Sequence, residues 1–447
     1  MPLRPPWRIT AMDRRLGLLA VPALGALVAE PLFVLTDTAM VGHLGQRVLA
    51  GMSIGSTVMQ TVIGLCIFLS YTTTPLVARR LGAGDRPGAV RAGIEGMWLG
   101  LGLGVVLALL GLPSGRAITG AFTPDPLVAE QAYRYIAICL WGLPGMLTVL
   151  AAAGLLRGLQ DTRTPLLVAG GGSVVNVALN WLFIYPLGLG IAGSALGTAI
   201  TQTLMAAVYA LVAIRAASAN GVSLAPGIGD RRQAFVASSL MLFRTLTLRI
   251  VLVVLVWAAA RLGTAELAAL QITMSAYMLL VNTMDALAIA AQAMIGHDLG
   301  AGDSVGVRRQ LNRIVGWGVL VGVVLGVLLA AGSPIIGMLF TPDASVRALL
   351  PVSFAMTAIF LPLCGILFVL DGVLIGAGDV RYLALAGLWP LLSFVVAITA
   401  MIMSQPSGIG AMVWLWSSYF GAFMSVRLLV LVLRSRTSTW LVTGYSK

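Results

Sequence analysis

The chain has 447 residues, of which 59% are hydrophobic and only 10% are charged, and its formal net charge is +12. Average soluble proteins carry about 25% charged residues, so this composition excludes a soluble globular domain and indicates an integral membrane protein. The basic residues are scattered singly between apolar runs, which argues against nucleic acid as a partner and is typical of the loops of a membrane protein.

Apolar runs separated by Gly, Pro and charged breaks predict twelve membrane-spanning helices. In chain order we expect these helices at residues 15–42, 47–77, 90–112, 126–156, 163–186, 190–215, 233–260, 265–296, 309–332, 345–376, 381–404 and 408–434. The predicted fold class is therefore an all-α integral membrane protein. A polar break at 216–232 divides it into an N-lobe (14–215) and a C-lobe (233–436), flanked by tails at 1–13 and 437–447.

The distribution of basic residues predicts the orientation of the chain. With the N-terminus inside, 20 basic residues fall in inside segments and only 4 in outside loops, namely Arg47, Arg116, Arg261 and Arg347. Because basic residues concentrate on the cytoplasmic side, we expect both termini to be cytoplasmic. Arg is used almost to the exclusion of Lys, with much Ala, Gly and Val, which is typical of a high-GC bacterium. We therefore expect a bacterial plasma membrane.

The two halves of the sequence repeat. "LGAGD" occurs at 81–85 and 299–303, and "FTPD" occurs at 122–125 and 340–343, both at an offset of 218 residues. "GLLRGLQDTR" at 154–163 matches "GVLIGAGDVR" at the same offset, which indicates an internal duplication. Each half has an even number of spans, so we expect the lobes to be related by a pseudo-twofold axis along the membrane normal, an arrangement suited to alternating access.

We interpret the two repeated motifs as structural. In "FTPD", Thr123 is expected to cap a helix, with Pro124 and Asp125 in its first turn. In "LGAGD", Asp85 and Asp303 are expected near the start of the next helix.

Polar residues found in only one half are better candidates for function. Adding 218 to Asp37 gives Leu255, and adding it to Glu30 gives Leu248. The same offset takes two amides of the fifth span, Asn176 and Asn180, to Phe394 and Ile398. A charge inside the bilayer costs at least ~2.5–3.5 kcal/mol, so we expect Asp37 to have a function. Because no arginine lies in the apolar core of the first six spans, we expect Asp37 to change its protonation state.

The predicted depths bring several of these groups together. Asp37 lies ~30 Å along the first span and Asn180 ~25 Å along the fifth, both toward the outside. Asn176 is one turn from Asn180 and shares its face. Thr198 and Tyr135 fall at a similar depth on the sixth and fourth spans, so we expect one polar pocket in the N-lobe.

The chain resembles the MATE (multidrug and toxic compound extrusion) transporter family, and its DinF branch in particular. The resemblance lies in "LTDTAMVGHLG", "LGAGD", "GLQDTRTPLLVAGGGSVVNVALNWLFIYPLGLGIAGSALGT" and "DALAIAAQAMIG", and it extends from about residue 15 to about 435. It implies export driven by H+ or Na+ flow, with Asp37 at the coupling position and Tyr135, Asn176 and Thr198 at cavity positions. The family often has a second aspartate where this chain has Asn180, so either Asp37 acts alone or Glu30 is the second acid.

The C-lobe contains buried charges of its own. Arg244 lies within the seventh span, and Asp285 and Asp371 lie in the inner halves of the eighth and tenth. We expect an ion-pair network in which Arg244 pairs with Asp285 or Asp371. The alternative is a substrate or ion site in the C-lobe.

These features predict a secondary antiporter that exports amphipathic, often cationic organic compounds in exchange for H+. The alternatives are a Na+-coupled exporter and a flippase for lipid-linked substrates. An enzyme is not expected, because the sequence has no nucleophile–base pair, metal-ligand spacing or P-loop. We expect no cofactor beyond the coupling ion and no metal. The expected partners are membrane lipids and a small organic substrate, with the chain acting as a monomer.

Overall fold

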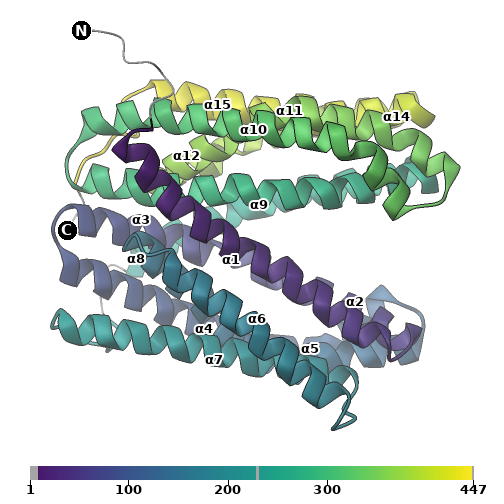
Figure 1. Cartoon of the computed structure of the whole chain (residues 1–447), viewed down its shortest axis with the longest axis horizontal. Coiled ribbons are helices and arrows are strands. Elements are labelled where there is room, and N and C mark those ends of the chain that lie inside the picture. Colours follow the sequence, from purple (N-terminus) through teal and green to yellow (C-terminus); the bar gives the residue numbers. More distant parts are fainter. Residues whose placement is uncertain (1–8, 228–230, 445–447) are drawn as a thin grey trace. The chain divides into compact units, whose positions relative to one another are not determined.

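The computed structural model describes residues 9–227 and 231–444, and within them twelve helices are long and apolar enough to span a membrane. The side chains of Glu30 and of residues 231–235 lie outside the described part. No strand occurs among the described residues. The predicted all-α membrane fold with twelve spans is therefore confirmed (Figure 1).

The helices of each half follow one another with short connections (Figure 1). The first half contains α1 (Ala11–Gly42), α2 (Gln46–Leu65), α3 (Phe68–Gly82), α4 (Arg86–Phe122), α5 (Pro126–Gly158), α6 (Arg163–Ile184) and α7 (Ile191–Ala219). The second half contains α8 (Arg231–Leu262), α9 (Thr264–Gly300), α10 (Ser304–Phe340), α11 (Ala344–Gly376), α12 (Val380–Ala386), α13 (Leu388–Ser404), α14 (Gly408–Trp416), the π-helix η1 (Ser417–Met424) and α15 (Ser425–Arg436).

Several helices are longer than the sequence suggested. The third span was expected at 90–112, but α4 runs from Arg86 to Phe122 with Pro113 inside it. Proline removes only one backbone donor, and in an apolar medium every remaining donor and acceptor still needs a partner within the helix. A glycine–proline break therefore did not end this helix.

The repeat appears in the helix boundaries and in the caps. Helices α10 and α11 begin and end 218 residues after α4 and α5. Before α4, Asp85 accepts a hydrogen bond from the backbone N–H of Gly88 at 2.8 Å, and before α10, Asp303 accepts one from Gly306 at 2.7 Å. The LGAGD motif therefore ends in an N-cap, as its structural interpretation required.

The cap in FTPD differs from the one expected. Asp125, rather than Thr123, is the N-cap of α5, and it accepts from the N–H of Leu127 at 2.9 Å. Pro126, rather than Pro124, takes the first helical position, where its missing N–H is not needed. The Thr123 hydroxyl instead accepts from the Asp125 N–H at 3.2 Å. The helix therefore begins at the first residue of the span expected at 126–156, but its cap is the carboxylate two residues after the expected threonine.

Glycines allow the central helix pair of each half to pack closely. A Cβ on Gly100 or Gly104 of α4 would lie 2.6 Å from the Leu147 carbonyl oxygen or 2.4 Å from Pro144 Cα of α5. The glycines 218 residues later, Gly318 and Gly322, approach α11 equally closely. Small residues four apart permit helix backbones to come together in lipid, so each half has the same closely packed helix pair, α4–α5 or α10–α11.

The chain forms two compact units, and α1 contributes to both. One unit contains the first turns of α1, up to Ala20, together with the second-half helices, and the other contains the chain from Val21 through α7. The sequence placed the whole first span in the N-lobe. The difference has an electrostatic cause, because Arg313 binds Asp13 at 2.9 Å and Arg15 lies 3.3 Å from Asp298.

Candidate functional site

Asp37 lies in the second half of α1 and is only 2% exposed. Its Oδ1 atom accepts a hydrogen bond from Asn180 Nδ2 of α6 at 2.9 Å and another from Ser194 Oγ of α7 at 2.7 Å. Both hydrogen bonds found for this carboxylate thus end on one oxygen. Asp37 is therefore held by uncharged donors from two neighbouring helices.

The two amides of α6 extend this hydrogen-bond network. Asn180 Nδ2 donates to Asn176 Oδ1 at 3.0 Å, and Asn176 Nδ2 lies 3.4 Å from Thr198 Oγ1 on α7. Both asparagines are at most 1% exposed. Their spacing of four residues places them on one helix face, so a continuous polar chain runs from Asp37 to Thr198.

Tyr135 of α5 joins the same cluster through Thr198. It is 5% exposed, and its side chain contacts Cys139 and Thr198. The structure therefore brings together all five residues predicted from the sequence to form a polar pocket in this half: Asp37, Tyr135, Asn176, Asn180 and Thr198. The side chain of Glu30, the second predicted acid, lies outside the described residues.

Glycines in α7 make room for the network. A Cβ on Gly197 would lie 1.9 Å from Asn180 Oδ1, and one on Gly193 would lie 2.8 Å from the backbone of Phe183. Helix α7 can therefore approach α6 closely enough for Ser194 to reach Asp37. In the sequence, this feature is the segment "GSALGT", in which small residues lie next to residues that carry hydroxyl groups.

Ser194 was not among the residues predicted to form the pocket, although it makes the shorter of the two hydrogen bonds to Asp37. A signal for it existed, because Ser194 is four residues before Thr198 and therefore shares its helix face. A single serine in an apolar span is otherwise uninformative, since serine also packs as a small residue.

The charge environment of Asp37 is unusual for a buried acid. Among the residues that the structure describes, no ion pair includes it. An ionised carboxylate in an apolar medium needs a counter-charge or several hydrogen bonds, and here only neutral amide and hydroxyl groups are found. Such a group has the chemistry to bind a proton or, with the neighbouring oxygens, a small cation.

The second-half charges form a cluster of a different kind. Asp371 of α11 forms ion pairs through Oδ2 with Arg244 of α8 and, at 2.9 Å, with Arg427 of α15. Arg427 was missed because a lone arginine in an apolar span gives no sign of its partner. Asp285, the other expected partner of Arg244, lies partly buried in α9.

The comparisons with known proteins agree on one family. A family model described as MatE matches residues 22–182 and 241–399. The chain is 28% identical over 438 residues to Protein DETOXIFICATION 44, chloroplastic, of Arabidopsis thaliana, covering 94% of this chain and 82% of that protein. It is 28% identical over 379 residues to the DNA damage-inducible protein F of Escherichia coli (strain K12), covering 83% and 82%.

A solved structure of an outward-facing multidrug resistance MATE family transporter of the MOP superfamily has a TM-score of 0.87 with this chain. The two are 20% identical, and the match covers 96% of each chain. This likeness shows that the two chains share their fold.

Proposed function

The chain belongs to the MatE family and is an efflux transporter, and we propose that an inward flow of H+ drives its export through Asp37. The observation that supports this proposal is the environment of Asp37, a nearly fully buried carboxylate that accepts hydrogen bonds from neutral donors and forms no described ion pair. A proton would remove the charge that this site otherwise has to accommodate in an apolar surrounding.

The hydrogen-bond pattern supports a proton rather than a bulkier ligand at Asp37. Asn180 and Ser194 both donate to Oδ1, so a proton on Oδ2 would leave both hydrogen bonds in place. Protonation then removes the demand of the carboxylate for water without dismantling the network. In the protonated state, a conformation that excludes water from the residues around Asp37 is therefore favoured. In the charged state, a conformation that admits water is favoured. A bound H+ shifts the conformational equilibrium only through this difference in affinity.

The cargo class follows from the charge of the same site. The polar residues of the network carry one carboxylate, two amides and hydroxyl groups, and none of them is cationic. We therefore propose amphipathic organic compounds, often cationic, as substrates. A flippase for anionic lipid-linked substrates would need arginines at this position instead.

Na+ coupling is the second candidate, because carboxylate, amide and hydroxyl oxygens also suit a small hard cation. In the second half, Asp371 is less suited to ion coupling, since it is already paired with two arginines. For location, we propose the plasma membrane of a bacterium with both termini cytoplasmic, on the strength of the arginine distribution.

The test uses proteoliposomes that contain the purified chain, a cationic dye such as ethidium and an imposed pH gradient. We expect dye movement with the wild type and with Asp37→Glu, which keeps a titratable acid. We expect background movement with Asp37→Asn, which keeps the shape but cannot exchange a proton. Undiminished pH-driven movement by Asp37→Asn would remove Asp37 from the mechanism. Movement driven by a Na+ gradient at uniform pH, but not by the pH gradient, would establish the Na+ alternative.

A further inference from the structure

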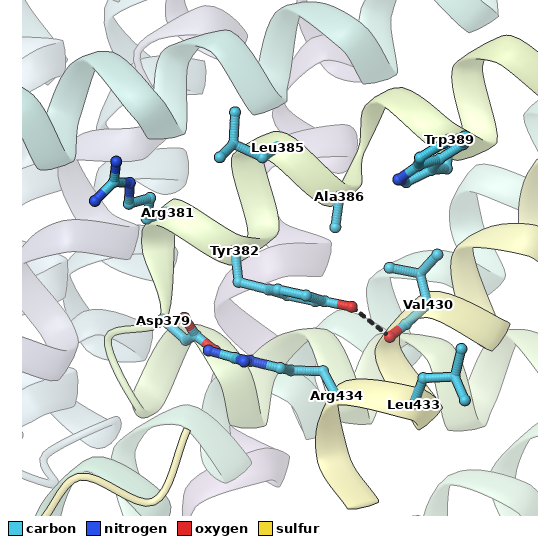
Figure 2. Close-up of a pocket in the computed structure, with 9 residues that line it drawn as sticks. All are labelled: Asp379, Arg381, Tyr382, Leu385, Ala386, Trp389, Val430, Leu433 and Arg434. Carbon is cyan, nitrogen blue, oxygen red and sulfur yellow. Dashed lines mark hydrogen bonds and ion pairs between the residues drawn. The ribbon is translucent and has the colours of Figure 1, made fainter. Parts of the chain in front are cut away.

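A pocket of about 550 Å³ lies in the second-half unit between the α12–α13 segment and α15. Figure 2 shows its lining, with Arg381, Asp379 and Arg434 toward one end and Trp389 and Leu433 toward the other. The proposed export mechanism makes no use of this pocket. Its lining combines cationic, aromatic and apolar side chains, a mixture that points to an amphipathic ligand.

The cationic end of the pocket is partly fixed in place. Arg434 Nε binds Asp379 at 2.6 Å, and its guanidinium carbon lies 4.5 Å from the centre of the Tyr382 ring. The Tyr382 hydroxyl in turn donates to the Val430 carbonyl at 2.9 Å (Figure 2). Arg434 is thus held by a carboxylate and a ring face while its remaining N–H groups stay available to a ligand.

Arg381 supplies the second cation of this end. It is exposed, and within residues 9–227 and 231–444 no ion pair includes it. With Arg434 and Asp379 it gives the pocket a net positive charge. A smaller cavity, which shares Ala386 and Val430 with this pocket, is lined by Asp371 and its two arginine partners, so it too carries one more positive than negative charge.

The other end of the pocket is apolar and open. Trp389 is 67% exposed, and Leu433 at the same end is more than half exposed, as is Leu385 between Arg381 and Ala386 (Figure 2). The exposed stripe continues along α13 through Leu392 and Val396. An apolar stripe on a membrane span faces acyl chains, and an indole next to it is typical of the level of the lipid headgroups. The cations also lie at that level, because the span begins at Val380 and α15 ends at Arg436.

The first half lacks the same features, which argues against a purely structural role. Subtracting 218 takes Tyr382, Trp389 and Arg434 to Thr164, Gly171 and Ala216. The repeated scaffold therefore forms without the aromatic residues and without this arginine. By contrast, Arg381 corresponds to Arg163, which is also exposed and lines neither of the two pockets, so Arg163 offers a matched control.

We propose that this pocket binds an anionic phospholipid, with the phosphate between Arg381 and Arg434 and the acyl chains along α13. The guanidinium groups donate to the phosphate oxygens, and the Trp389 indole packs at the glycerol level. The charge complementarity and the exposed apolar stripe select a lipid over a free anion, because a soluble phosphate would leave the apolar end uncovered. The proposal is independent of the coupling ion and of the exported compound.

The first experiment uses Trp389 as the reporter, with the full chain in nanodiscs. Bromine-labelled phosphatidylglycerol or bromine-labelled phosphatidylcholine is added at equal, low mole fraction to a phosphatidylcholine background. The difference in fluorescence between the wild type and Trp389→Phe isolates the signal of Trp389. We expect this signal to be quenched more strongly by the anionic lipid. Equal quenching by both lipids would overturn the proposal.

The second experiment removes the free cation. Arg381→Gln is expected to weaken the preference for phosphatidylglycerol about fivefold, the factor for losing one arginine near an anionic surface, whereas Arg163→Gln is expected to leave it unchanged. Native mass spectrometry of lipid bound to the detergent-solubilised chain measures the same ratio. Equal effects of both variants, or displacement of the lipid by glycerol phosphate at equal concentration, would count against a lipid site.

Discussion

The two halves of this chain share a helical scaffold but treat their buried acids in opposite ways. In the first half, Asp37 accepts hydrogen bonds from an amide and a hydroxyl and forms no described ion pair. In the second half, Asp371 lies between Arg244 and Arg427. Neutral donors allow a carboxyl to gain and lose its proton, whereas two guanidinium groups favour its ionised form. The duplicated helices are therefore alike in the two halves, and the side chains around each acid determine whether it can exchange a proton.

The largest effect on stability is expected from removing an arginine from the second-half cluster. Arg244→Met leaves Asp371 with Arg427 alone, and we expect a loss of about 3–5 kcal/mol in the free energy of unfolding, because a buried charge loses a partner. Thermal unfolding in detergent measures the effect. The triple variant Arg244→Met/Asp371→Leu/Arg427→Met is the control, because it leaves no charge of the cluster behind, and it should recover most of the loss. A single variant as stable as the wild type would show that the pair is not structural.

The contrast can also be tested by placing an acid where the second half has none. Leu255 corresponds to Asp37 and is fully buried. We expect Leu255→Asp to destabilise the chain by about 2.5–3.5 kcal/mol, because no polar network was built around this position. Leu255→Asn separates the effect of charge from that of polarity and should cost less. Normal stability of Leu255→Asp at neutral pH would show that the surrounding helices accommodate an acid without a dedicated network.

A glycine substitution in the first half tests whether the Asn180 amide has to be in place beside Asp37. A Cβ on Gly197 would meet Asn180 Oδ1 at 1.9 Å, so Gly197→Ala should displace this amide from Asp37. We expect a cost of about 1–3 kcal/mol and a loss of pH-driven export. Gly170→Ala on α6 is the control, because a Cβ there has no atom within 4 Å. Unchanged export by Gly197→Ala would indicate that the amide does not support the acid.

The smallest expected effect comes from the hydroxyl that binds Asp37. Ser194→Ala removes a hydrogen bond that is worth about 1 kcal/mol more to the charged carboxylate than to the protonated one. Because that bond stabilises the ionised form, its loss should move the pH of half-maximal export upward by about 0.7 units. Dye export measured over a pH series gives this midpoint, and Ser173→Ala, whose hydroxyl bonds its own helix, is the control. A shift in the opposite direction would contradict the assigned role of Ser194.

Hydropathy and the repeat predicted the twelve spans, because a lipid-spanning helix needs a long apolar run whatever its neighbours are. Depth along the helix placed Asp37, Asn180 and Thr198 at similar levels, because each residue adds a fixed rise. Depth does not give the direction in which a side chain points around the helix axis. For this reason Ser194 and Arg427 were missed, and the sequence could not show which of two acids Arg244 contacts, whereas the structure places Arg244 on Asp371.

The first helix has a consequence for the order in which the chain matures. Asp13 binds Arg313 and Trp317, partners that lie 300 and 304 positions later in the chain. Ribosomes add about 5–20 residues per second, so these partners are made roughly 15–60 s after Asp13. The contacts of Asp13 therefore form only after part of the second half has been synthesised. The partners of Asp37 on the same helix, Asn180 and Ser194, are synthesised much earlier. A chain halted after its first half would contain the complete hydrogen-bond network of Asp37, but the partners of Asp13 at the start of the same helix would be missing.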